Sequence, residues 1–222
     1  METAVIDLAL KVIKIIIIDL LLSGDNAIVI AMATLRLSPK SRKKAILLGT
    51  SGAIALRILL TCAGTVLLTI PLLQFLGGLV LIWVTSRLLI DTFSREAQNA
   101  NVDSPTRLIH AIKIIIIADF SMSLDNILAI SGASHGEIRL VIFGLLLSIP
   151  ILMFFSQKIA VFMEKYPLLV YVGAIILSWV SAELICSDRI VGQYISKLVI
   201  SIAIVVCVFV ISKIKFYLIK IR

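Results

Sequence analysis

The chain has 222 residues, of which 60% are hydrophobic and only 15% are charged, and its mean hydropathy is +1.14. A soluble domain carries about 45–50% apolar and about 25% charged residues, so this composition argues against a cytosolic enzyme, a secreted disulfide scaffold and a DNA-binding domain. The net charge of +8 does not indicate a nucleic-acid partner, because the excess Lys and Arg residues of a membrane protein usually lie in cytoplasmic loops. We therefore expect a polytopic protein whose immediate partner is the lipid bilayer.

Apolar stretches long enough to cross a bilayer, about 18 residues or more, follow one another along the chain. Hydropathy and helix-breaking residues predict seven transmembrane helices, at about residues 6–35, 44–68, 71–92, 107–133, 138–161, 167–187 and 195–217. The first stretch has no basic segment before it and is interrupted by charged residues, so we expect a true span rather than a signal peptide. The predicted fold class is an all-α polytopic membrane protein, with residues 1–222 forming a single transmembrane domain.

Basic residues predict the orientation of these spans. The first predicted loop holds a dense cluster of them, namely Arg36, Lys40, Arg42, Lys43 and Lys44. Such clusters favour the cytoplasmic side, which places the N-terminus outside and the C-terminus in the cytoplasm. As an alternative, the basic clusters bind anionic lipid or a partner protein.

The two halves of the sequence resemble each other. Residues 15–33, IIIIDLLLSGDNAIVIAMA, match residues 115–133, IIIADFSMSLDNILAISGA, at nine of nineteen positions. Residues 71–91 match residues 167–187 at eight of twenty-one positions. Each copy covers three spans, and because three is odd the second copy enters the membrane from the opposite side, as is typical of secondary transporters. The predicted architecture is two inverted three-helix repeats and an extra helix, at about residues 6–92, 107–187 and 195–217.

Carboxylates inside the predicted spans are the strongest functional signal. Of the thirteen acidic residues, five lie inside the spans and away from their ends: Asp19, Asp25, Asp119, Asp125 and Glu183. An ionised carboxylate at the centre of a spanning helix costs roughly 2.5–3.5 kcal/mol on insertion scales. Protonation, a basic partner or a bound cation must offset that cost. The four aspartates belong to two copies of one motif, D-x3-S-x-D-N, so we expect a common role for them.

The spacing within the motif favours a bound cation. Asp19, Ser23 and Asn26 share one helix face, and a local unwinding at Ser23–Gly24 would turn Asp25 inward. Across the predicted twofold axis the two motifs meet, and they offer carboxylate, carboxamide and hydroxyl oxygens. Mg²⁺, Ca²⁺ and Mn²⁺ prefer such ligands, whereas zinc and copper sites favour His and Cys. The candidate metal-binding residues are Asp19, Asp25, Asn26, Asp119, Asp125 and Asn126.

Two other interpretations of these side chains stay open. In the first, Asp and Asn only hold helices together by hydrogen bonds. In the second, the carboxylates relay protons without a metal. Proton movement is also compatible with a metal site, since metal binding displaces protons from carboxylates.

The charged residues inside the predicted spans also include Arg57 and Arg87, besides Glu183. We expect Arg57 to balance a nearby aspartate. Arg87 and Glu183 hold equivalent positions in the two repeats with opposite charge, so they are able to pair as a gate. We favour the simpler interpretation, in which Arg87 extends to the cytoplasmic surface.

The two D-x3-S-x-D-N motifs, the seven predicted spans and the length of the chain resemble the TerC family of integral membrane proteins, and within it the short, YjbE-like bacterial members. The resemblance covers nearly the whole chain. It implies that Mn²⁺ is exported from the bacterial cytoplasm and that the six candidate residues bind it during transport. The residues alone indicate a divalent cation, and only the resemblance selects manganese and the outward direction.

The leading hypothesis is a secondary transporter in the bacterial inner membrane that exports Mn²⁺ by alternating access, coupled to proton entry. The chain has no G-x4-G-K-[ST] nucleotide-binding motif and no nucleophile–base pair, so we expect neither an enzyme nor an organic cofactor. One alternative is an interaction protein that delivers metal to exported enzymes at the secretion machinery. Another is an exporter of Ca²⁺ or Mg²⁺.

Overall fold

The computed structural model describes residues 13, 16–17, 24–63, 67, 70–97, 105–133, 138–192 and 197–221. All regular elements in these ranges are helices, as predicted. They are α2 (Gly24–Thr34), α3 (Pro39–Cys62), α5 (Leu73–Ala97), α6 (Pro105–Ala133), α7 (Ile138–Lys165), α8 (Leu168–Ser187) and α9 (Lys197–Ile221).

The described helices overlap the predicted spans, with longer C-terminal ends in three cases. α5 runs to Ala97, α7 to Lys165 and α9 to Ile221, beyond the predicted ends at residues 92, 161 and 217. The predicted start of the second span at residue 44 is wrong, because α3 begins at Pro39, directly after its N-cap Ser38. Hydropathy locates the apolar part of a helix, whereas the helix itself ends where its backbone hydrogen bonds end. In the first predicted span, at about residues 6–35, the described helix is α2, which forms the second part of that span.

The bundle has an apolar exterior and buried polar groups, as expected in lipid. Leu59, Phe162 and Leu168 are more than half exposed, whereas Ser121 and Ser178 are fully buried. A soluble monomer rarely exposes such a continuous apolar surface. Four described segments are long and apolar enough to cross a membrane, namely Pro39–Cys62, Leu73–Thr92, Ile142–Lys165 and Leu168–Ser187. The chain therefore has the fold of an integral membrane protein.

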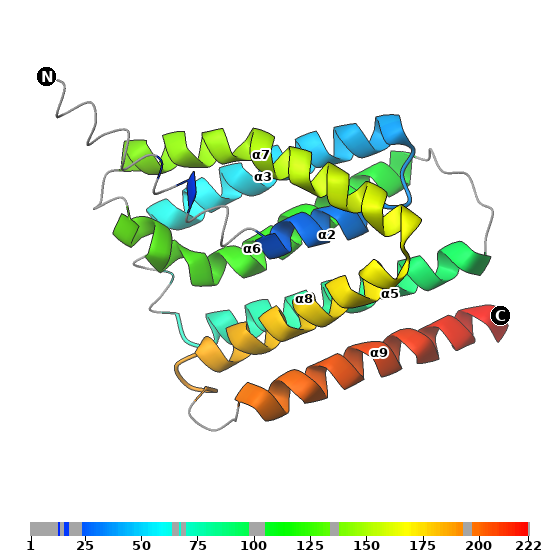
Figure 1. Cartoon of the computed structure of the whole chain (residues 1–222). Helices are drawn as coiled ribbons and strands as arrows, with labels where there is room; N and C mark the ends of the chain where they lie inside the picture. Colours follow the sequence, from blue (N-terminus) through cyan, green and yellow to red (C-terminus); the bar gives the residue numbers. More distant parts are fainter. Residues whose placement is uncertain are drawn as a thin grey trace, which may run out of the picture.

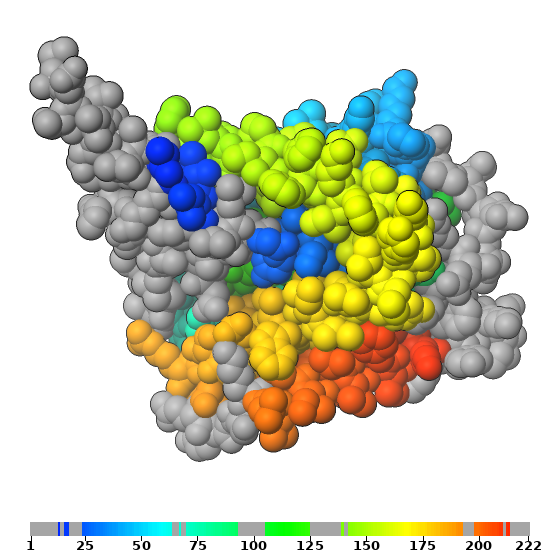
Figure 2. All heavy atoms as spheres, in the orientation of Figure 1, coloured from blue at the N-terminus to red at the C-terminus, as the bar shows by residue number. Residues whose placement is uncertain are grey.

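The helices run side by side in layers. Figure 1 shows α3 and α7 on one side, α2 and α6 in the middle, α5 and α8 next, and α9 at the far edge. The contacts agree, since α3 packs on α6, α5 packs on α8, and α9 packs on both α5 and α8. On the face seen in Figure 2, α2 is visible only as a small patch between α7 and α8. This short helix therefore lies inside the bundle.

One end of the bundle, which we call the basic end, gathers segments that carry positive charge. The α2–α3 and α7–α8 connections lie there, together with the end of α9, on the right in Figure 1. Arg42 is 5% exposed at this end, and it donates hydrogen bonds to the carbonyl oxygens of Thr34, Leu35 and Leu37. It also forms an ion pair with Glu164 of α7. These bonds fix the end of α2 against α3 and α7.

The helices α5 and α8 approach each other closely at Gly78. A Cβ atom at this position would lie 2.5 Å from Cγ1 of Ile185 and 2.9 Å from the carbonyl oxygen of Ser181. Small residues allow this kind of close packing between transmembrane helices.

We expect Gly78→Ala to lower the stability of the purified protein by about 1–3 kcal/mol, because the added methyl group overpacks the α5–α8 contact. Titration with SDS in mixed micelles measures this change. Gly24→Ala is the matched control, since a Cβ atom at Gly24 meets nothing within 4 Å. Equal stability of the two variants would contradict the close packing.

Candidate functional site

A buried polar cluster joins α2, α3 and α6. Asp119 of α6 is central: its Oδ1 accepts hydrogen bonds from Asn26 Nδ2 at 2.9 Å and from Arg57 Nη2 at 2.5 Å. Its Oδ2 accepts from Ser123 Oγ at 3.2 Å, and Ser123 Oγ accepts from Arg57 Nε at 3.1 Å. Asn26 and Arg57 are each 2% exposed, and Asp119 is 6% exposed. The carboxylate and the guanidinium neutralise each other where a single unpaired charge would cost several kcal/mol.

The Ser123 hydroxyl belongs to this cluster. The buried hydroxyls of Thr34, Thr85 and Ser178 donate to the carbonyl oxygen four residues earlier in their own helices, which is a common arrangement for Ser and Thr in helices. Ser123 donates instead to the Asp119 carboxylate, one helical turn before it on the same face. The hydroxyl thus helps to orient both Asp119 and Arg57.

Two oxygen atoms beside the cluster have no hydrogen-bond partner among the described residues. They are Asn26 Oδ1 and Thr50 Oγ1, and both are buried. Asn26 and Thr50 line a cavity of about 10 Å³ together with Arg57 and Asp119. A single water molecule needs about this much space. The cavity therefore has room for one small ligand that bonds to oxygen atoms.

The structure brings together two of the six predicted metal ligands, Asn26 and Asp119, from different copies of the motif. Asp25 follows in the first turn of α2, where it is half-buried and its Oδ1 accepts from the backbone N–H of Asn26 at 2.9 Å. Asp19 lies outside the described residues, and so do the side chains of Asp125 and Asn126, whose backbone belongs to α6. Among the described side chains, no three His, Cys, Asp or Glu residues come together. The complete six-residue set stays a prediction.

The two arginines inside the spans have different surroundings. The prediction that Arg57 balances an aspartate is confirmed by its ion pair with Asp119. Arg87 lies 3.9 Å from Asp91, one turn later on α5, and its side chain is 47% exposed, as expected for a side chain that extends to the surface. The sequence patterns did not single out Thr50, although it lies seven residues before Arg57 and helix periodicity places both on one face of α3.

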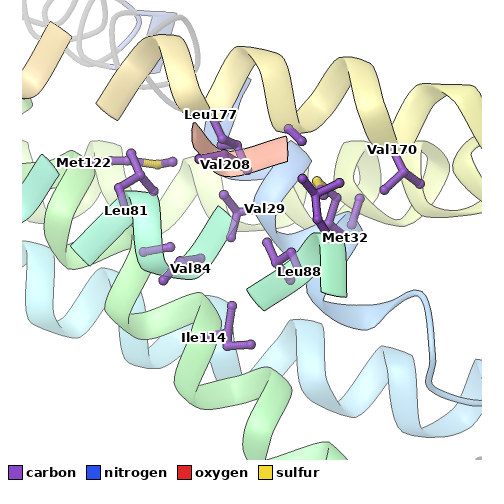
Figure 3. Packing of buried hydrophobic residues seen from close by; sticks show 14 of the residues in the cluster. Val29, Met32, Leu81, Val84, Leu88, Ile114, Met122, Val170, Leu177 and Val208 are labelled. Carbon is purple, nitrogen blue, oxygen red and sulfur yellow. The ribbon is translucent and has the colours of Figure 1, made fainter. Parts of the chain in front are cut away.

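A second cavity, of about 600 Å³, lies at the basic end. Its charged and titratable lining residues are Arg36, Arg87, Asp91, Arg107, His110 and Glu164. Its wall also includes Met32, Leu88 and Ile114. These three side chains pack with Val29 in one apolar cluster (Figure 3), and Val29 lines the small cavity. An apolar layer therefore separates the large cavity from the polar cluster.

Comparison with known proteins agrees with this membrane fold. The model of the family "Integral membrane protein TerC family" matches residues 6–220. The chain belongs to the TerC family. This confirms the family predicted from the two repeated motifs.

Relatives of this TerC-family chain are membrane proteins by name. It is 42% identical to membrane protein YjbE of Bacillus subtilis (strain 168) over 191 residues, which cover 86% of each chain. It is 25% identical to inner membrane protein YgdQ of Escherichia coli (strain K12) over 166 residues, which are 68% of this chain and 69% of YgdQ. It is 22% identical to membrane protein YkoY of Bacillus subtilis (strain 168) over 180 residues, which are 74% of this chain and 56% of YkoY. No solved structure matches the chain.

Proposed function

We propose that this TerC-family protein is a secondary transporter that exports Mn²⁺ from the bacterial cytoplasm by alternating access, with protons entering in exchange. The observation that carries the proposal is the contact between Asn26 and Asp119. These residues come from the two copies of the repeated motif, and they meet deep inside apolar helices. Ionisable side chains inside a membrane are costly, and they mark the pathways of ions and substrates.

The oxygen atoms around this contact suit a divalent cation. Asp119 supplies a carboxylate, and Asn26 and Thr50 supply oxygens that have no partner among the described residues beside the small cavity. With the other predicted ligands, they make an oxygen shell of the kind that Mn²⁺, Mg²⁺ and Ca²⁺ prefer. The family resemblance selects Mn²⁺ among these ions. Protons compete with metal for the same carboxylates, so proton binding from outside would release the ion there.

The pattern of helix contacts supports two inverted repeats. A twofold exchange of the repeats converts α3 into α7 and α6 into α2, so a contact of α3 with α6 corresponds to one of α7 with α2. Both contacts occur, and α5 and α8, which would exchange with each other, also pack together. In the proposed orientation the basic end faces the cytoplasm, the N-terminus lies outside and the C-terminus lies inside.

The two cavities support a route for the ion. The large cavity would admit ions from the cytoplasm as far as Met32 and Ile114. The apolar layer then closes the way to Asn26 and Asp119. In alternating access this layer opens toward the cytoplasm in one conformation and stays closed in the other, while the site itself remains near the midplane.

Export is tested in proteoliposomes that contain a Mn²⁺-sensitive dye. We expect the unmodified protein to move Mn²⁺, and Asp25→Asn and Asp125→Asn to reduce the flux by about 10–100-fold, because each removes a charged ligand. Asp103→Asn is the control, since Asp103 lies between the predicted repeats. In cells loaded with manganese, the two site variants should also lose tolerance and accumulate the metal.

The same assay separates this proposal from its alternatives. Unchanged flux, tolerance and cellular manganese in both site variants would reject the assigned residues. Binding of Mn²⁺ without flux would favour delivery of metal to exported enzymes instead of transport. If Ca²⁺ or Mg²⁺ were transported faster than Mn²⁺ in competition, that ion would replace Mn²⁺ as the proposed substrate, and the proposed mechanism would stand.

A further inference from the structure

Arg57 lines the small cavity together with Asp119, the carboxylate that would bind the ion under the proposed function. The arginine lies on α3, five residues before the end of the helix at Cys62, and is 2% exposed. Its Nη2 donates to Asp119 Oδ1, and its Nε donates to Ser123 Oγ. The guanidinium therefore meets both the carboxylate and the hydroxyl that orients it.

Both carboxylate oxygens of Asp119 already accept hydrogen bonds. Oδ1 accepts from Asn26 and Arg57, and Oδ2 accepts from Ser123. Asn26 and Ser123 are neutral and are able to remain near a bound cation. Arg57 is a cation itself, and two positive charges on one buried carboxylate repel each other strongly, because the interior screens charge poorly.

Arg57 is also a difference between the two repeats. Under the proposed twofold relation α7 corresponds to α3, yet the sequence of α7 has no Lys or Arg from residue 141 to residue 157. Arg57 neutralises Asp119 of the second motif, and residues 141–157 of α7 offer no corresponding charge to the first motif.

We propose that Arg57 is a resident counter-cation that competes with the transported ion for Asp119. When a divalent cation binds, Arg57 leaves the carboxylate, and when the ion departs, Arg57 returns. This role rests on the proposed function. It has two consequences: the pair weakens binding enough for the ion to be released, and it keeps Asp119 neutralised while the ion-free transporter changes conformation.

The first test measures Mn²⁺ affinity by titration calorimetry on the full chain in lipid nanodiscs. We expect Arg57→Gln to bind Mn²⁺ about tenfold more tightly than the unmodified protein, because the competing charge is absent. Arg57→Lys keeps the charge but loses the planar fork that meets Asp119 and Ser123 together, so its affinity should lie between the two. Lys113→Gln, which removes an exposed positive charge from α6, should leave the affinity unchanged.

The second test separates ion binding from the conformational change by which the ion-free transporter returns to its starting state. In proteoliposomes, Arg57→Gln should lose net Mn²⁺ efflux, because the ion-free transporter would have to move with an unpaired buried carboxylate. Exchange of radioactive for unlabelled Mn²⁺ needs no ion-free movement, so it should continue. A residue that only holds the helices together would reduce both fluxes alike.

The outcomes distinguish this role from the proposed function. If the unmodified protein neither binds nor moves Mn²⁺, the proposed function is rejected and the role of Arg57 with it. If the unmodified protein transports Mn²⁺ but folded Arg57→Gln binds it equally or less tightly, only the counter-cation role is overturned. Should Arg57→Gln fail to fold even in Mn²⁺, Arg57→Lys decides, since an affinity no higher than that of the unmodified protein overturns the role.

Discussion

Asp119→Asn is expected to lower the stability of the purified protein by about 3–5 kcal/mol and to abolish Mn²⁺ binding. Removing one partner of a buried ion pair leaves the other charge uncompensated, and this costs far more than the pair itself contributes. Here the residual charge is that of Arg57, which is 2% exposed. SDS titration in mixed micelles measures the stability, and calorimetry measures the binding.

A double variant separates the two effects of Asp119. Asp119→Asn combined with Arg57→Gln removes both charges, so we expect most of the stability to return while Mn²⁺ binding stays absent. Asp91→Asn is the control for loss of a carboxylate, because the Asp91 side chain is 28% exposed and lies 3.9 Å from Arg87. An exposed pair of this kind contributes about 0–1 kcal/mol. If the single and double variants were equally unstable, Arg57 would not be the source of the loss.

The fold class was accessible from the sequence because lipid imposes simple rules on composition. Long apolar stretches must form helices in a bilayer, and the described helices occupy the predicted stretches. The repeated motif likewise indicated that polar side chains from distant segments meet. The structure bears this out for Asn26 and Asp119, which are 93 positions apart in the sequence.

The pairing within the polar cluster was not accessible in the same way. Asp19 and Asp119 hold equivalent positions in the two copies of the motif. The sequence match does not predict that the Asn of one copy donates a hydrogen bond to the Asp of the other. That choice depends on how α2 packs against α6, which brings Asn26 Nδ2 to Asp119 Oδ1. Thr50 belongs to no sequence motif. It is part of the candidate site because it lines the small cavity, which forms only when α2, α3 and α6 pack together.

Arg42 shows a different limit of reasoning from sequence. As one of five basic residues in the first predicted loop, it resembles its exposed neighbours Lys43 and Lys44. All three residues lie on α3 and not in a loop, but Arg42 is 5% exposed, while both lysines are exposed. The rule that places basic residues in the cytoplasm counts charges and does not distinguish a solvated lysine from an arginine that binds backbone carbonyls.

Arg42→Gln is therefore expected to destabilise the protein by about 3 kcal/mol. The guanidinium donates to the carbonyl oxygens of Thr34, Leu35 and Leu37 and pairs with Glu164. A helix end needs partners for its last carbonyl groups, and here one side chain binds that of Thr34, the last residue of α2, and two carbonyl groups of the α2–α3 connection. Without it, the end of α2 would lose its attachment to α3 and α7.

Two neighbouring variants make the test of Arg42 specific. Lys43→Gln removes the same charge from an exposed position on the same helix, so it should change stability by less than about 0.5 kcal/mol. Glu164→Gln should lower the stability by about 1 kcal/mol or less, because the Glu164 side chain is 33% exposed and solvent screens its attraction to Arg42. The ordering Arg42, Glu164, Lys43 in SDS titrations would show that the arginine acts through the backbone of α2. Equal losses for Arg42→Gln and Glu164→Gln would place the effect in the ion pair instead.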